Sequence, residues 1–132
     1  EHRRKTELIA MAVATEHYER LGYEALDVSR ERVGWDITFV SKVDGRKNVE
    51  VKGLSRSQPV VSLTRNELRK AKSNPHWELV VITDAHSDER RTARFYSREA
   101  VHAARTEKRF RHGSKALMLD FSAVEPDLEL RV

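Results

Sequence analysis

The fold is decided by residues 35–53, WDITFVSKVDGRKNVEVKG, in which two apolar runs flank a turn. The turn contains an Asp-Gly pair, which is a strong hairpin signal, so we expect the first run to fold back beside the second. Side chains alternate along a strand, so Glu50 and Lys52 point to one face and the valine between them to the other. The hairpin can therefore bring Asp36, Glu50 and Lys52 to one point of a sheet.

Two carboxylates and an ammonium at a strand end form a metal site suited to phosphodiester cleavage. Mg²⁺ and Mn²⁺ prefer hard oxygen ligands, so the predicted ligands are Asp36, Glu50 and the backbone carbonyl of Val51. The same residue types also form ordinary cross-strand ion pairs on solvated sheets. An acid two residues before a lysine is expected about once by chance in this composition. Charged groups inside apolar strands are unfavourable unless they are paired or bind a metal, so both interpretations remain open.

Several ordered blocks of the sequence resemble a known domain across residues 6–83. The blocks are Glu7 with Ala10-Met11, Leu21-Gly22, Asp27-Val28-Ser29, Gly34-Trp35-Asp36, Glu50-Val51-Lys52-Gly53 and Thr64-Arg65-Asn66-Glu67. This pattern is similar to the NO VEIN C-terminal-like domain, a family found attached to helicases and bacterial defence proteins. The resemblance implies membership of the PD-(D/E)xK, or restriction-endonuclease-like, superfamily and an Mg²⁺- or Mn²⁺-dependent endonuclease.

The resemblance also implies a role for each residue of the predicted site. Asp36 would hold the metal ion against the scissile phosphate, and Glu50 would share the metal and orient the attacking water. Lys52 would polarise that water and neutralise the developing charge, with its pKa lowered if the cleft is dry. In-line attack would leave 3′-hydroxyl and 5′-phosphate ends.

Residues 6–21 are predicted to form a helix that carries two further acids. Thr6 can cap this helix, and Gly22 can end it. Its apolar stripe contains Leu8, Ile9, Ala12, Val13 and Leu21. Glu7 and Glu16 face nearly opposite directions on a helix, so both cannot reach the same metal ion. Glu7 lies in a block that carries the resemblance, so it is either an additional acid of the site or an acid that complements the helix dipole. Glu16 is expected to be solvated.

The remaining pattern predicts a single α/β domain with a mixed sheet over residues 1–132, excised from a longer protein. Strands are expected at 24–28, 35–41, 48–53, 60–63, 77–83 and 116–121, and further helices at 65–73 and 97–104. Thr64 and Glu67 form a capping box at the start of the second helix. The strand at 60–63 is expected at a sheet edge, and the apolar strand at 77–83 in a sheet centre, covered on both faces. By resemblance, these elements imply a restriction-endonuclease-like α-β-β-β-α-β core with a C-terminal basic extension.

Positive charge is concentrated in residues 90–115, which contain nine Lys or Arg against two acids. Such a run attracts phosphate backbones, although a solvated helix and loop would have the same composition. A phosphate could also bind near the free amides at the start of the second helix. The predicted nucleic-acid-binding residues are Arg65, Asn66, Arg90, Arg91, Arg94, Arg98, Lys108, Arg109 and Arg111.

Composition argues against several other classes of protein. The chain has no cysteine, so it has neither a disulfide nor a thiolate zinc site, and a reducing compartment is expected. Its six histidines show no paired ligand spacing, and no Gly-rich phosphate loop accompanies a strand. No apolar stretch is long enough to span a membrane, and no signal peptide is visible. We therefore expect a cytoplasmic protein with no membrane partner, and the resemblance to a domain of bacterial defence proteins implies a prokaryotic one.

Three functions are compatible with these features. The first is an Mg²⁺-dependent endonuclease acting on double-stranded DNA, within a restriction, anti-phage or helicase-linked protein. The second is a catalytically inactive nucleic-acid-binding module of the same fold, and the third is a domain that docks onto its parent helicase. The intact set of Asp36, Glu50 and Lys52 favours the first. One site cuts one strand, so double-strand cleavage would need a homodimer or a second domain.

Overall fold

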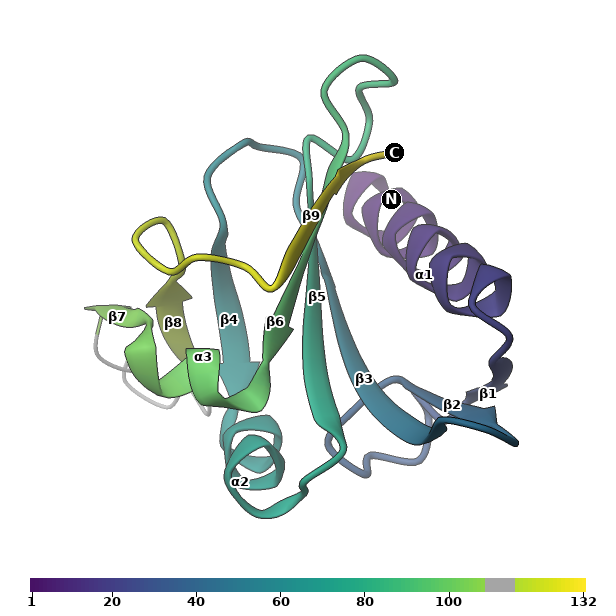
Figure 1. Cartoon of the computed structure of the whole chain (residues 1–132). Coiled ribbons are helices and arrows are strands. Elements are labelled where there is room, and N and C mark those ends of the chain that lie inside the picture. The colour runs from purple at the N-terminus through teal and green to yellow at the C-terminus, as the bar shows by residue number, and fades with distance from the viewer. Residues whose placement is uncertain (109–115) are drawn as a thin grey trace.

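The computed structural model describes residues 1–108 and 116–132, which form three helices and nine strands (Figure 1). The elements in chain order are α1 (His2–Arg20), β1 (Glu24–Asp27), β2 (Ile37–Ser41), β3 (Gly45–Gly53), β4 (Val60–Thr64), α2 (Arg65–Ser73), β5 (Trp77–Thr83), β6 (Thr92–Ser97), α3 (Arg98–Ala103), β7 (Arg105–Lys108), β8 (Ala116–Asp120) and β9 (Leu128–Arg131). The fold is therefore a mixture of α and β structure, as the sequence predicts.

The main sheet has six strands in the order β1-β2-β3-β5-β6-β9. Its only parallel neighbours among the described strands are β3 and β5, and the other pairs are antiparallel. A second sheet has the order β4-β8-β7. Helix α1 lies on one face of the main sheet, while α2, α3 and the second sheet lie on the other (Figure 1).

Side-chain alternation along β3 separates the core from the predicted site. Val49 and Val51 belong to the hydrophobic cluster that α1 covers. Glu50 and Lys52 consequently point to the opposite face, where α2 lies. The hairpin prediction is confirmed, because Ile37 pairs with Val49 in an antiparallel register. This register places the predicted acid, Asp36, just before the start of β2 and beside the middle of β3.

The predicted buried face of the first helix is wrong. The helix begins at His2, so Thr6 lies inside it rather than at its cap, and its buried residues are Thr6, Ala10, Ala14 and Tyr18. Of the predicted stripe, Ala12 is exposed and Ile9 and Val13 are partly buried, while Leu8 and Leu21 are 62% and 57% exposed. The reason is a close approach between helix and sheet: a Cβ on Gly53 would come within 2.8 Å of the Ala10 Cβ. Only small side chains fit at this contact, so they displace the leucines from the interface.

Most of the other predicted elements are confirmed. Helix α2 has the predicted bounds and its capping box: the Thr64 hydroxyl accepts from the Glu67 amide, and the Glu67 carboxylate accepts from the Thr64 amide. Strand β5 lies inside the main sheet and is almost entirely buried. Strand β4 is an edge strand, but of the second sheet. Strands β6, β7 and β9 were not predicted from the sequence, and the first two fall in the segment that was predicted to be a basic extension.

Candidate functional site

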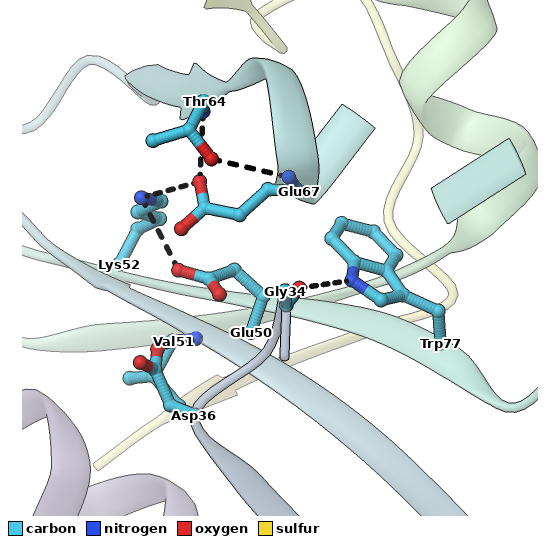
Figure 2. Close-up of polar contacts among 8 residues, drawn as sticks. All are labelled: Gly34, Asp36, Glu50, Val51, Lys52, Thr64, Glu67 and Trp77. Carbon is cyan, nitrogen blue, oxygen red and sulfur yellow. Dashed lines mark hydrogen bonds and ion pairs between the residues drawn. The ribbon is translucent and has the colours of Figure 1, made fainter. Parts of the chain in front are cut away.

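The hairpin brings the three predicted catalytic residues together on the α2 side of the main sheet. Glu50 is only 2% exposed, and its Oε2 atom lies 3.2 Å from the Lys52 ammonium. Asp36 follows the loop that precedes β2, and its Oδ2 atom accepts a hydrogen bond of 2.9 Å from the Val51 amide. This bond fixes the Asp36 carboxylate against the edge of β3, next to Glu50 (Figure 2).

A third carboxylate, which the sequence analysis assigned only a capping role, completes the cluster. The Glu67 Oε1 atom lies 3.1 Å from the Lys52 ammonium and also accepts from the Thr64 amide at 2.9 Å. Figure 2 shows Lys52 between the carboxylates of Glu50 and Glu67. One side chain thus ties the start of α2 to the lysine of β3. The capping-box spacing was the only local signal at Glu67, and it does not reveal which strand the helix contacts.

Burial sets the proton affinity of the Asp36 and Glu50 carboxyls. Loss of solvation raises the pKa of Glu50 well above its ordinary value, and the negative charges of Asp36 and Glu67 add to this effect against the opposing charge of Lys52. Burial also raises the pKa of Asp36, although the hydrogen bond from the Val51 amide and an interaction with Glu50 oppose the shift. The pair therefore holds protons more tightly than exposed carboxyls do.

The predicted lowering of the Lys52 pKa is wrong. Burial alone would lower it, but the adjacent Glu50 and Glu67 carboxylates more than offset this effect, so the pKa of Lys52 is raised. Its side chain is 22% exposed, so the ammonium is charged at neutral pH and partly open to a ligand. Lys52 can therefore supply positive charge and hydrogen bonds, but it cannot act as a general base in this state.

The cluster opens into a pocket of about 750 Å³. Its lining residues are Ser29, Arg32, Gly34, Trp35, Asp36, Glu50, Thr64, Arg65, Asn66, Glu67 and Arg69. One wall is the loop before β2, and the other is the first half of α2. The pocket thus combines an acidic floor with three arginines, a combination suited to holding a metal ion and an anionic substrate together.

The loop wall is held by contacts to distant elements. The buried Trp77 indole donates to the Gly34 carbonyl at 2.9 Å, and the Asn66 amide donates to the Arg32 carbonyl at 3.2 Å. Gly34 has a φ of +101°, and a Cβ there would come within 2.4 Å of the Lys70 Cγ. Glycine is therefore required at this position both by backbone conformation and by space. These contacts give the pocket a defined wall on the side of Asp36.

The pocket arginines were only partly predicted. Arg65 and Asn66 were expected at a phosphate site and do line the pocket. Arg32 and Arg69 were missed. Arg32 lies in a loop without a recognised motif, and Arg69 follows Arg65 by one helical turn. That spacing could have indicated a shared helix face, but not which pocket the face borders.

The predicted additional acid Glu7 is not brought to this cluster. Its side chain is exposed, and it does not line the pocket. The alternative dipole role is also unsupported, because the first turn of α1 contains no acid. Glu16 is solvent-exposed as expected and pairs with Arg20.

The predicted basic extension makes mainly structural contacts. Arg91 donates to the Ala85 carbonyl, Arg94 pairs with Glu129, and Arg98 donates to the Lys72 carbonyl at the end of α2. Arg90 is exposed and lies 3.9 Å from Asp84. None of these four arginines lines the acidic pocket. Lys108 ends β7, and the predicted residues Arg109 and Arg111 lie outside the described residues.

The residues at the pocket floor fit a hard divalent cation that takes two protein carboxylates as ligands. Over residues 1–108 and 116–132, no three His, Cys, Asp or Glu side chains are arranged to hold a metal ion. Asp36 and Glu50 nevertheless supply two carboxylates, and the buried Glu50 Oε1 atom has no hydrogen-bond partner among the described residues. Mg²⁺ commonly takes one or two carboxylates and completes its shell with water and substrate phosphates. At Val51, the contact seen is from its amide to Asp36, and the predicted carbonyl ligand stays a prediction.

Fold and site together define a mixed α and β domain with a recessed acid–lysine cluster in a pocket that three arginines also line. Residues 6–96 match the family described as Protein NO VEIN, C-terminal, which covers more than half of the chain, and the chain belongs to this family. Comparisons with curated proteins and with solved structures give no match. Among the described helices, none has the length and apolarity needed to cross a bilayer.

Proposed function

We propose that this domain is a metal-dependent nucleic-acid phosphodiesterase of the PD-(D/E)xK superfamily, with DNA as its substrate. The chain order is α1-β1-β2-β3-β4-α2-β5, with β4 in the second sheet. Within the main sheet, β1, β2, β3 and β5 follow α1, and β3 and β5 are parallel neighbours, which supports the restriction-endonuclease-like core expected from the sequence. A restriction, anti-phage or helicase-linked parent protein is part of the same proposal. The prokaryotic, cytoplasmic setting expected from the sequence belongs with it.

The observation that carries the proposal is the environment of Glu50. A carboxylate with 2% exposure and one oxygen without a hydrogen-bond partner in the described chain is unfavourable in a purely structural role. Asp36, a half-buried acid, lies beside Glu50 and adds a second negative charge there. An arrangement that raises two carboxyl pKa values at the floor of a pocket is typical of a functional site.

The proposed chemistry assigns each group a task. Mg²⁺ or Mn²⁺, held by Asp36, Glu50 and the Val51 carbonyl, would polarise the scissile phosphate. Glu50 orients the attacking water, and the Lys52 ammonium stabilises the negative charge that develops on the phosphoryl oxygens. Water adds to phosphorus as the bond to the 3′-oxygen breaks. The water loses a proton to solvent and the departing 3′-oxygen takes one from solvent, which leaves a 3′-hydroxyl and a 5′-phosphate.

One observation favours the catalytically inactive alternative, a nucleic-acid-binding or helicase-docking module of the same fold. Lys52 is paired with both Glu50 and Glu67, as in a purely structural ion-pair network. In that case the acid–lysine cluster would only join α2 to β3, and the pocket arginines would bind nucleic acid without cutting it.

Cleavage of supercoiled plasmid in Mg²⁺ or Mn²⁺ separates these functions. We expect the wild type to nick the plasmid, and Asp36→Asn and Lys52→Ala to lose this activity. Glu7→Gln and the exposed-site control Asp44→Asn are expected to retain it. If the folded wild type cuts neither the plasmid nor single-stranded DNA, the nuclease proposal is wrong, and a gel shift on the same DNAs then distinguishes nucleic-acid binding from docking.

A further inference from the structure

We propose, on the basis of the proposed function, that the substrate is a single strand of nucleic acid that follows α2 away from the acidic pocket. This proposal replaces the duplex expected from the sequence. It rests on a second hollow next to the first, on the cations that separate them, and on the depth of the carboxylates.

The second hollow has a volume of about 490 Å³ and lies between α2, α3 and the second sheet. Arg65 and Arg69 line both hollows, so the two are neighbours across the same face of α2. Lys72 and His102 add positive and polar character to the second hollow, and side chains such as Leu68 and Leu119 give it an apolar floor. The pair of hollows therefore forms a continuous basic path with surfaces for both phosphates and bases.

The cations along this path occur at helical spacing. Arg65, Arg69 and Lys72 are related as i, i+4 and i+7, so they lie on one face of α2. All three are exposed, and at 1.5 Å per residue they extend over about 10 Å. A row of cations that tracks a backbone, with apolar and aromatic surfaces beside it, is the usual design of a single-strand binding groove. Trp35 offers such an aromatic surface in the first hollow.

The depth of the pocket floor favours a single strand of nucleic acid over a duplex as the substrate. Glu50 is 2% exposed, and its pocket has the volume of a cavity that encloses one small ligand. A duplex carries its phosphates on the outside of a broad double helix, whereas Glu50 lies at the bottom of a pocket between one loop and one helix. A scissile phosphate can therefore reach the carboxylates when one strand enters alone, with a base displaced from its stack.

The test measures binding of fluorescent oligonucleotides to the 132-residue chain in EDTA, so that cleavage plays no part. The probes are an oligothymidylate, an oligouridylate and a mixed-sequence DNA duplex of equal length. The test variant is Arg69→Ala with Lys72→Ala. The control is Arg3→Ala with Arg4→Ala, which removes the same charge from exposed positions on α1, across the main sheet.

We expect the wild type to bind a single strand more tightly than the duplex. The test variant should lower the slope of log affinity against log salt by about 1.4, because each phosphate contact on a single strand contributes about 0.7. Between about 50 and about 200 mM salt, its affinity loss should then be about sevenfold smaller than that of the wild type. The control should keep the wild-type slope. Whichever single strand binds more tightly, the oligothymidylate or the oligouridylate, would show whether the natural ligand is DNA or RNA. Either result supports the proposed binding path along α2.

Equal or tighter binding of the duplex would overturn the proposal, as would an unchanged salt slope in the folded test variant. These outcomes are independent of catalysis. A chain that binds single strands along α2 but never cleaves would refute the nuclease while keeping the path. A protein that nicks plasmid but binds duplex more tightly would keep the nuclease proposal and refute the single-strand path.

Discussion

Replacing Lys52 with Met tests the electrostatics of the site most directly. The substitution keeps the length and apolar stem of the side chain but removes its charge. Lys52 lies 3.2 Å from Glu50 and 3.1 Å from Glu67, and neither carboxylate is more than 16% exposed. Its loss leaves three neighbouring acids, Asp36 included, without a cation.

The size of the effect follows from the distances. At an effective dielectric constant of about 20, each of the two pairs is attracted by about 5 kcal/mol. The wild type loses several kcal/mol of solvation when it buries the Lys52 ammonium, and the Met variant avoids this cost. The net loss of stability expected for breaking a buried pair is therefore about 3–5 kcal/mol. A domain of this size has a stability of about 5–15 kcal/mol, so Lys52→Met should remain folded but weakened.

The sign of the pH dependence can also be stated. The folded-state pKa of Glu50 is already raised above its unfolded value, so its contribution to stability is present at acid pH and lost as pH rises through the folded pKa. Removing Lys52 raises that pKa further. The penalty of Lys52→Met should therefore be largest at neutral pH and shrink as the pH falls toward the ordinary pKa of a glutamate.

Urea unfolding monitored by circular dichroism measures these changes. With a slope of about 2 kcal/mol per molar urea, the midpoint at pH 7 should fall by about 1.5–2.5 M. Combining Glu50→Gln with Lys52→Met should cost less than Lys52→Met alone, and the exposed-site control Lys42→Met should change stability by less than about 0.5 kcal/mol. A loss below about 1 kcal/mol at pH 7, or one that does not shrink with acid, would refute the buried-charge reasoning.

Three further results are expected. Mg²⁺ or Mn²⁺ should raise the melting temperature of the wild type, and the rise should grow with pH because the Glu50 carboxyl loses its proton. Glu50→Gln should abolish this rise. An equal rise in both proteins would contradict the proposed metal site. Thr64→Ala removes the acceptor for the Glu67 amide and should cost about 1 kcal/mol in urea unfolding, and a neutral result would show that the capping box adds nothing. Gly34→Ala must adopt a positive φ and meet Lys70, so it should cost about 1–3 kcal/mol and weaken oligonucleotide binding; wild-type stability and affinity would show that the loop wall is not constrained.

The parts of the fold that the sequence predicts are those with local signals. The Asp-Gly turn specifies the hairpin, the Thr64 to Glu67 spacing specifies the start of α2, and the apolar run at 77–83 specifies a buried strand. Strand β6 was not predicted because it contains the charged residue Arg94. Its charge is neutralised by Glu129 on β9, a partner 35 residues away. No local pattern shows such a pairing.

Long-range contacts also explain what was missed at the site. The hairpin alone predicts that Asp36, Glu50 and Lys52 meet. The third acid reaches Lys52 because the crossover through α2 returns the chain to β5, the parallel neighbour of β3. The exposed leucines of α1 show the same limit, since the close contact at Gly53 is what excludes them from the interface.

The charge balance of the cluster is what separates a functional site from an ordinary ion pair. One acid would satisfy Lys52, yet both Glu50 and Glu67 pair with it, and Asp36 lies beside Glu50. Three negative charges with one positive leave a net charge of −2 when all four groups are ionised. Burial raises the pKa of Asp36 and Glu50, and the neighbouring acids add to the shift at Glu50. The excess negative charge also destabilises the metal-free fold, which a purely structural network would have no reason to retain. It equals the charge of one divalent cation. The composition of the cluster therefore supports the proposed metal-dependent function over the inactive module.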